Sequence, residues 1–275
     1  MWRRLRSAHL GKVPIFDQPH YGELDRARGE VVSRLLAELK PMLNLQTAVD
    51  VGCGLGYFSG FLRSLGMQVT AVDGREENVE ETQRRNPSIK VHCYNAEDSG
   101  LRTLGRFDLV FCFGLLYHLE NPLLAIRNLQ AMMGKLLLVE GVIFPGSDPV
   151  MALIDEEIHE DQGLNHFAFY PTEACLVKML YRSGFSSVLR LVQQPAHSHY
   201  HSAGGVRRVR TILAAAHGSI DSAQLAQVAE ISSPIRPWDP VSGIRQGDPV
   251  QKLRRFAEKS LPEKVKSLKR IIKAG

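Results

Sequence analysis

The sequence predicts an α/β fold in which a seven-stranded sheet, mostly parallel with its last strand antiparallel, carries helices on both faces. Two observations lead to this prediction. Apolar runs of five to eight residues alternate with helical patterns along most of the chain, as is typical of parallel strands that are buried on both faces. The first run ends in a glycine-rich turn and the second ends in an acid, the order found in half of a nucleotide-binding sheet.

The glycine-rich turn is the most informative segment of the chain. Glycines stand at positions 52, 54 and 56, between the apolar run 47–51 and a helical pattern that starts at 57. Glycines let backbone N–H groups approach a ligand closely, and a helix start offers unpaired N–H donors to an anionic group. The second apolar run, 68–73, ends in Asp73, which can accept hydrogen bonds from two ribose hydroxyls.

The spacing of the glycines distinguishes between cofactors. A dinucleotide fingerprint, G-x-G-x-x-G, needs its third glycine at position 57, where this chain has Tyr57. The chain has G-x-G-x-G instead, with Asp50 two residues before the first glycine. This spacing argues against a dinucleotide oxidoreductase.

The remaining elements follow in chain order. A helix over 22–39 is expected, because leucines and valine recur along one side and Pro41 follows. Asn121 and Pro122 are typical of a helix start. The strands are expected at 47–51, 68–73, 89–94, 107–113 and 135–142, with a closing antiparallel pair at 186–193 and 206–216. Further helices are expected at 57–65, 76–85 and 172–183.

These elements define the expected domains. Residues 45–216 form the ligand-binding domain, preceded by a basic segment and helix over 1–44. Residues 144–171 interrupt the alternation and are expected to form a lid or acceptor-binding insert. Residues 217–275 are expected to hold a short helical segment, a proline-containing linker and a basic amphipathic tail.

The string Asp50-Val51-Gly52-Cys53-Gly54-Leu55-Gly56, with the acid at 73, resembles the first motif of the class I S-adenosylmethionine-dependent methyltransferases. The string FDLVFCFGLLYHLENPL resembles a subgroup of that family. This subgroup includes wobble-uridine tRNA-modifying carboxymethyl and methyl transferases, and bacterial methyltransferases of small molecules or glycans. The string YPTEACLVKMLYRSGFSSV resembles the family's helix before strand six. The resemblance implies a Rossmann-like methyltransferase sheet and S-adenosyl-L-methionine as cofactor, and it leaves the acceptor open.

The resemblance also implies roles for individual residues. Phe113 and Gly114, after the fourth strand, would lie under the cofactor. Many members have Asp where this chain has Asn95, but an Asn can still donate to and accept from adenine. The alternatives are a plain tight turn at the glycines and a polar loop at Asn95 and Glu97. The implied cofactor-binding residues are Asp50, Gly52, Gly54 and Gly56 at the methionine end, Asp73 at the ribose, and Asn95, Ala96 and Glu97 at the adenine.

Methyl transfer from a sulfonium is an in-line displacement, so alignment and exclusion of water matter most. A base is needed where the acceptor carries a proton that must leave. His118 is the candidate, because it follows the fourth strand at the rim where open α/β sheets bind ligands. The alternative is that Tyr117 and His118 only shape the turn before Asn121. Glu140, in the fifth strand, is expected to be a structural or rim acid.

Two polar clusters invite a metal interpretation, but no metal site is predicted. The insert holds several acids, and a solvated helix face explains them as well as a metal or a cationic acceptor does. The histidines at 197, 199 and 201 share one side of an extended segment, where solvent exposure or substrate contact is the simpler interpretation. The members of the first cluster are Asp155, Glu156, Glu157, Glu160 and Asp161, with His159 and His166 nearby.

Composition is that of an ordinary globular protein, with 275 residues and 44% hydrophobic residues. No apolar run approaches the roughly 20 residues of a membrane span, and the basic N-terminus lacks the apolar core of a signal peptide. Four cysteines without paired spacing favour free thiols in a reducing compartment. A cytoplasmic location is therefore expected.

Charge is concentrated at the two ends. Residues 251–275 carry nine Lys/Arg and two Glu, a charge of +7, and residues 1–12 carry four Lys/Arg and no acid, a charge of +4. The formal total of +5 leaves −6 for residues 13–250. The tail is expected to be a basic amphipathic helix that docks on the acidic body, lies on the inner membrane surface, or meets RNA phosphates. A homodimer element is a further interpretation, and the acidic body weakens the RNA one.

The function expected from these observations is S-adenosylmethionine-dependent O-methylation of a small-molecule or glycan acceptor. The alternative enzyme is a transferase that modifies the wobble uridine of tRNA. The alternative without catalysis is a cofactor-binding scaffold tethered by its basic ends.

Overall fold

The computed structural model describes residues 14–156, 163–164, 167–202 and 209–230. The basic segment 1–12, the tail, His166 and the residues Glu157, His159, Glu160 and Asp161 lie outside the described residues. The chain divides into two compact units, residues 1–231 and 232–275, and all described residues belong to the first. None of the helices in the described residues is long and apolar enough to cross a membrane.

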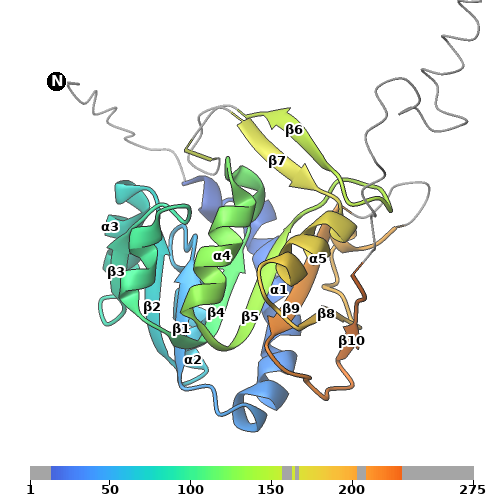
Figure 1. Cartoon of the computed structure of the whole chain (residues 1–275). Coiled ribbons are helices and arrows are strands. Elements are labelled where there is room, and N and C mark those ends of the chain that lie inside the picture. Colours follow the sequence, from blue (N-terminus) through green and yellow to red (C-terminus); the bar gives the residue numbers. More distant parts are fainter. Residues whose placement is uncertain (1–13, 157–162, 165–166, 203–208, 231–275) are drawn as a thin grey trace, which may run out of the picture. The chain divides into compact units, whose positions relative to one another are not determined.

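The described elements alternate between strands and helices for most of the chain (Figure 1). The strands are β1 Thr47–Val51, β2 Gln68–Asp73, β3 Lys90–Cys93, β4 Phe107–Phe113, β5 Met133–Val142, β6 Met151–Asp155, β7 Phe167–Pro171, β8 Ser187–Leu191, β9 Arg210–Ala216 and β10 Leu225–Gln227. The α-helices are α1 Pro19–Met42, α2 Tyr57–Ser64, α3 Glu76–Arg85, α4 Pro122–Met132 and α5 Glu173–Arg182. The 3₁₀ turns are η1 Ile15–Asp17, η2 Ser99–Leu104, η3 Leu116–His118 and η4 Ser198–Tyr200.

The main sheet has the order β10-β8-β9-β5-β4-β1-β2-β3. Its central pairs β4–β5, β1–β4, β1–β2 and β2–β3 are parallel. Strand β9 is antiparallel to both β5 and β8, so the predicted mostly parallel sheet with an antiparallel closing strand is confirmed. The strand order places β1 in the middle of the five parallel strands, between β4 and β2, so its carboxyl end lies beside those of β2 and β4.

The predicted count of seven strands is wrong, because the sheet has eight within the described residues. The additional strand is β10, which pairs with the edge strand β8 through Leu225 and Leu191. We expected a short helical segment after residue 217. A three-residue strand carries too little periodicity to be recognised, and its backbone pairs only because β8 offers a free edge.

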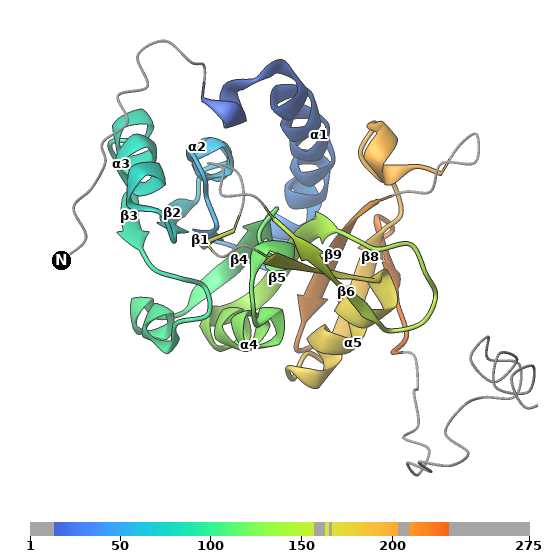
Figure 2. The same ribbon diagram turned by 90° about the horizontal axis from the view of Figure 1, so that it is seen from above.

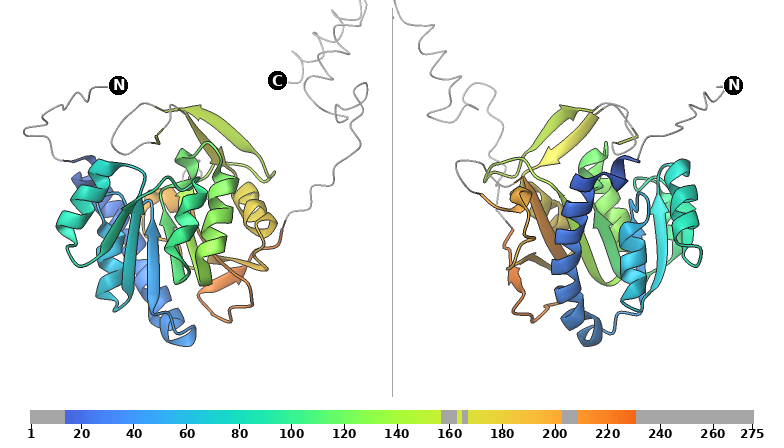
Figure 3. Two further views of the ribbon diagram at one scale, coloured as in Figure 1. Left: turned by 60° about the vertical axis from the view of Figure 1, so that its left-hand side comes forward. Right: turned by 180° about the vertical axis from the view of Figure 1, so that it is seen from behind.

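The helices cover both faces of the sheet, as predicted. Helices α1 and α2 lie on one face and α4 and α5 on the other (Figure 3). Leu35 of α1 and Leu62 of α2 pack with Phe111, while Leu129 of α4 packs with Val110 on the opposite face. Alternate residues of β4 therefore supply two separate cores. Helix α1 and strand β10 lie outside the predicted 45–216 domain but pack into the first of these cores.

The predicted insert at 144–171 contains a separate two-stranded sheet, in which β6 and β7 pair antiparallel. This hairpin lies above the edge of the main sheet (Figures 1 and 2). Tyr170 of β7 packs edge-to-face on Tyr117 of η3, with ring centroids 5.7 Å apart. The insert therefore sits over the turn that follows β4.

Candidate active site

A cavity of about 740 Å³ opens at the carboxyl ends of β1, β2 and β4. This volume lies within the range of roughly 300–1,000 Å³ that is usual for small-molecule sites. Its wall includes Phe16 near the start of the described chain and Arg210 near its end. Most of the predicted cofactor-binding residues also line it, namely Gly52, Gly54, Gly56, Asp73, Asn95, Ala96, Phe113 and Gly114.

The glycine turn needs glycine for its backbone shape. Gly52, Gly54 and Gly56 all have positive φ, at 80°, 54° and 82°, a region that side chains with a Cβ rarely adopt. A Cβ at Gly56 would also lie 2.7 Å from atoms of Thr82 and Asn86 in and after α3. The turn is therefore compact, and α2 begins directly behind it.

Asp73 ties the end of β2 to the glycine turn. Its Oδ2 accepts a hydrogen bond of 2.9 Å from the N–H of Gly54. Its Oδ1 accepts from the N–H of Arg75 at 2.9 Å and from the amide of Asn78 at 3.0 Å. Burial raises the pKa of Asp73 and outweighs these hydrogen bonds, which lower it. A carboxylate has about four acceptor positions, so one stays available to a hydroxyl of a ligand in the cavity.

Two predicted residues do not face the cavity. Asp50 is 2% exposed and accepts a hydrogen bond of 2.6 Å from the Ser59 hydroxyl in α2. Burial raises the pKa of Asp50 to about 7. Because its carboxyl group bonds Ser59 of α2 and is buried, Asp50 supports the turn from beneath. Glu97 accepts a hydrogen bond from the N–H of Asn121 and contributes to the start of α4.

His118 lies on the cavity wall at the end of η3. Its Nδ1 lies 2.6 Å from Oε1 of Glu156, the residue that follows β6. The ring also packs against Tyr117, with centroids 4.1 Å apart. The sequence prediction put His118 at the rim after the fourth strand, and it gave Glu156 no role beyond membership of the acidic cluster in the insert.

Comparisons with known proteins agree with this geometry. A family model described as a methyltransferase domain matches residues 49–135. The tRNA U34 carboxymethyltransferase of Pseudoalteromonas translucida is 28% identical over 161 residues, covering 56% of this chain and 49% of that protein. The protein of the same name from Edwardsiella ictaluri is 30% identical, covering 58% and 50%. The chain thus spans about half the length of the curated relatives it matches.

Solved structures share the fold. The N-terminal domain of EvdMO1, crystallised with S-adenosylhomocysteine and D-fucose present, has a TM-score of 0.57 at 21% identity, covering 72% of this chain and 84% of that one. Magnesium protoporphyrin IX methyltransferase from Synechocystis, with bound S-adenosylhomocysteine, has a TM-score of 0.51 at 20% identity, covering 76% and 90%. Residues 49–135 are thus similar to the methyltransferase-domain family, and the chain has the fold of class I S-adenosylmethionine-dependent methyltransferases. S-adenosylmethionine fits the cavity, because Asp73 and the glycine turn meet at one end of it.

One wall of the cavity, formed by Arg28, Tyr117 and Arg210, was not predicted from the sequence. Glu140 of β5 is fully buried and takes hydrogen bonds from Arg28 of α1 at 2.9 Å and from Arg210 of β9 at 3.1 Å. Tyr200 of η4 donates a further hydrogen bond to it. Burial opposes ionisation of Glu140, but the two guanidinium groups outweigh burial and lower its pKa. Arg210 also donates to the Tyr117 hydroxyl at 3.3 Å, which fixes a cation in the cavity wall.

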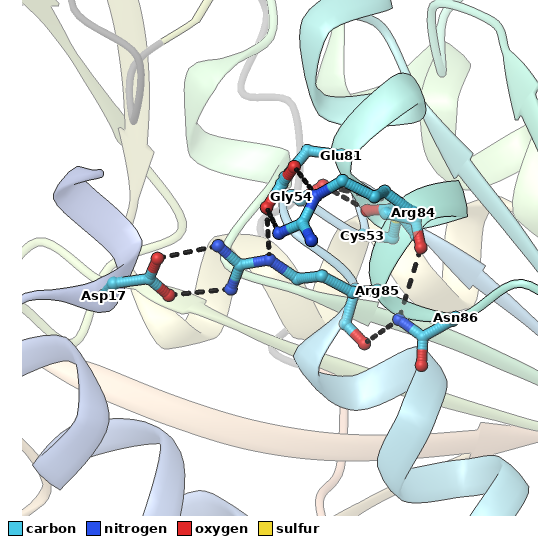
Figure 4. A network of polar contacts seen from close by, with 9 residues as sticks. Asp17, Cys53, Gly54, Glu81, Arg84, Arg85 and Asn86 are labelled. Atoms are coloured by element: carbon cyan, nitrogen blue, oxygen red, sulfur yellow. Dashed lines mark hydrogen bonds and ion pairs between the residues drawn. The ribbon is translucent and has the colours of Figure 1, made fainter. Parts of the chain in front are cut away.

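The described N-terminal segment closes another side of the cavity. A Cβ at Gly54 would lie 3.6 Å from the ring of Phe16. The next residue, Asp17, accepts two hydrogen bonds, of 2.7 and 2.6 Å, from Arg85 at the end of α3 (Figure 4). Glu81 holds the same guanidinium at 2.7 Å. This pair fastens η1 over the glycine turn, and nothing in the spacing of Asp17 and Arg85 along the chain predicts it.

Of the described residues, no group of three or more His, Cys, Asp or Glu is arranged to hold a metal ion. The rings of His197, which precedes η4, and of His199 in η4 pack edge-to-face with centroids 4.5 Å apart, and His197 Nδ1 accepts from the N–H of His199. Of the insert acids that the structure describes, Asp155 lies in strand β6 and Glu156 follows it, so these two are not on the predicted helix face.

Proposed function

We propose that this chain transfers a one-carbon group from S-adenosylmethionine to an acceptor bound beside His118. The observation that carries the proposal is the single cavity that joins the glycine turn, Asp73 and His118. S-adenosylmethionine supplies an electrophilic carbon attached to a good leaving group. The chain's own residues then bind and orient the two reactants, exclude water, and accept a proton from the acceptor.

For the acceptor, we propose the wobble uridine of tRNA. This was the alternative expectation from the sequence, and the names of the relatives support it better than they support a small molecule or glycan. Those relatives are carboxymethyltransferases, so a donor whose sulfonium bears a carboxymethyl group belongs in the test beside S-adenosylmethionine. Arg210 favours its inclusion, because a cation in the cavity wall suits a carboxylate.

O-methylation of a small molecule or glycan is the second candidate. The charge of −6 over residues 13–250 opposes close approach of a phosphate backbone. A cavity of about 740 Å³ also suits a cofactor together with a compact acceptor. Both points concern access to the site, and neither defines the methylated atom.

The first experiment is calorimetric titration with S-adenosylmethionine, S-adenosylhomocysteine and NADH in parallel. Micromolar binding of the two sulfur ligands without NADH binding is expected. Bulk tRNA and a glycan panel are then offered with each radiolabelled sulfonium donor. Label in tRNA supports the first candidate, label in a glycan supports the second, and cofactor binding without any transfer supports the scaffold alternative.

Peripheral membrane contact, homodimerisation and a cytoplasmic location belong to the same proposal. The membrane contact rests on the +7 charge of residues 251–275 and the +4 charge of residues 1–12, the dimer on the amphipathic pattern of the tail, and the location on four cysteines without paired spacing. Salt-sensitive co-sedimentation with anionic liposomes tests the membrane contact, and sedimentation velocity tests the dimer. A full chain that stays monomeric and in the supernatant at low salt contradicts both.

A further inference from the structure

The contact between His118 and Glu156 joins two segments that are 38 residues apart in sequence. The two side chains are 13% and 4% exposed, so both are largely withdrawn from water. Glu156 uses both carboxylate oxygens, because Oε1 meets His118 and Oε2 accepts from the N–H of Gly163 at 3.0 Å. Burial acts against ionisation, but these two hydrogen bonds prevail and lower the pKa of Glu156. The carboxyl is therefore an anion at neutral pH.

An anionic carboxylate at Nδ1 determines the tautomer of a neutral imidazole. A carboxylate only accepts hydrogen bonds, so Nδ1 must carry the proton and Nε2 must carry the lone pair. Within the described part of the chain, no hydrogen bond involves Nε2 of His118, and this side chain lines the cavity. The lone pair is therefore available to an acceptor.

Few charged or titratable groups surround the pair of His118 and Glu156 in the described residues. The charged and titratable groups around the imidazole are Glu156 itself, Tyr117 packed at a tilt against the ring, and, beyond Tyr117, Tyr170 of β7 and Arg210 of β9. Among these described neighbours, Glu156 is the carboxylate in direct contact with the imidazole, and it lies at Nδ1.

Gly163 links the pair to the cofactor end of the cavity. Its carbonyl accepts a hydrogen bond of 2.8 Å from Arg75, the residue two positions after Asp73. A Cβ at Gly163 would lie 2.5 Å from the carbonyl oxygen of His118, so only glycine fits there. One chain of contacts therefore runs from the end of β2 through Gly163 and Glu156 to His118.

We propose that Glu156 is the positioning residue that makes His118 the base for an acceptor carrying a proton. The acceptor's proton moves to Nε2 while the electron pair of its O–H or N–H bond supports the new bond to carbon. The carbon–sulfur bond breaks, and its electron pair stays on sulfur, which becomes a neutral thioether. The imidazolium that forms is stabilised by the anionic Glu156 and later releases its proton to water. This inference rests on the proposed function for its catalytic step.

The decisive variant is Glu156→Gln, which keeps the size of the side chain and removes its charge. Asp155→Asn is the matched control, because Asp155 is the neighbouring acid, is exposed, and is the last residue of β6, directly before Glu156. Imidazole ¹⁵N NMR of the full chain saturated with S-adenosylhomocysteine reports the tautomer without any acceptor. We expect His118 to be protonated at Nδ1 in the wild type and in Asp155→Asn, and to become a tautomer mixture in Glu156→Gln.

Turnover is then measured with the radiolabelled donor and bulk tRNA between pH 5 and 9. We expect kcat to fall at least about tenfold in Glu156→Gln, with KM and donor affinity within about twofold of wild type. His118→Ala should lower kcat at least as far as Glu156→Gln does, and Glu156→Asp should recover part of kcat.

The two failures are distinguishable. A wild-type His118 protonated at Nε2, or a tautomer indifferent to Glu156→Gln, overturns the inference whether or not turnover is found. Equal kcat in Glu156→Gln and Asp155→Asn also overturns it. If NMR shows the expected tautomer but no acceptor takes up label, the proposed function is wrong, while the positioning of His118 by Glu156 is established.

Discussion

Replacing Asp50 with Asn should stabilise the cofactor-free protein at alkaline pH. Asp50 is buried beneath the glycine turn, and burial is the largest cause of its raised pKa. The negative charges of Asp73 and Asp25 raise the pKa further. The Ser59 hydrogen bond acts in the opposite direction but does not offset burial. An Asn keeps an oxygen that can accept the same hydrogen bond, so the change removes the ionisation and little else.

The size of the effect follows from the shift in pKa. The pKa of Asp50 rises from 3.8 to about 7 on folding, and each unit corresponds to about 1.4 kcal/mol. Because the folded pKa lies above the unfolded one, the folded protein binds the proton more tightly. Stability therefore falls as pH rises from about 4 to about 7 and stays reduced above that range. The expected gain for Asp50→Asn is roughly 4 kcal/mol at pH 8 and close to zero at pH 4.

Urea unfolding of both proteins at pH 4, 6 and 8, without ligand, measures this gain. The quantity to compare is the difference between the two free energies of unfolding, because other groups titrate equally in both. A difference that does not grow between pH 4 and pH 8 refutes the reasoning. So would an Asp50→Asn protein less stable than wild type at pH 8, since that would mean the ionised carboxylate is favourable in the folded state.

Three further predictions concern the described carboxylates. Asp73→Ala should weaken binding of S-adenosylhomocysteine by roughly 1–3 kcal/mol, a factor of about 5–150 by calorimetry, and unchanged affinity would remove the ribose assignment. Asp17→Asn should speed release of the ligand about two- to fivefold in stopped flow, because a partly exposed ion pair contributes roughly 0.2–1 kcal/mol. Arg84→Gln is the control, since Arg84 bonds Glu81 and does not touch η1. Equal release rates in the two variants would exclude the fastening role of Asp17. Asp108→Asn should lower the free energy of unfolding by roughly 1 kcal/mol at pH 7 and leave it unchanged near pH 2. Hydrogen bonds from Lys135, Gln46 and Thr47 outweigh desolvation and hold the pKa of Asp108 at about 2. Urea unfolding that shows the opposite pH trend would contradict this.

The central sheet and the cofactor end of the cavity were predictable because their signals are local. An apolar run predicts a buried strand from its own residues. The spacing of Gly52, Gly54 and Gly56 reports a turn whose positive φ angles the structure contains. Asp73 follows a strand directly, so its place at the carboxyl edge of the sheet needs no knowledge of distant residues. The same holds for His118 after β4.

The rest of the site depends on contacts between distant segments. Glu156 stood in a run of acids that looked like a solvated helix face, yet it is buried because Gly163 and His118 satisfy it. Asp50 belongs to the glycine motif, but its side chain points under the turn because Ser59 of α2 meets it there. Neither direction is encoded in the local pattern, since a strand residue can face either side of a sheet depending on what packs against it.

The Glu140 cluster shows how such distant contacts shape the acceptor side of the cavity. Arg28 and Arg210 come from opposite ends of the described chain and meet at one buried carboxylate. Removing one partner of a buried ion pair leaves the other charge uncompensated, so each of these side chains holds the others in place. Arg210 in turn orients Tyr117 through its hydroxyl, and the Tyr117 ring packs at a tilt against His118. The His118 ring is therefore held from two directions, by Glu156 at its Nδ1 and by Tyr117, which the Glu140 cluster orients.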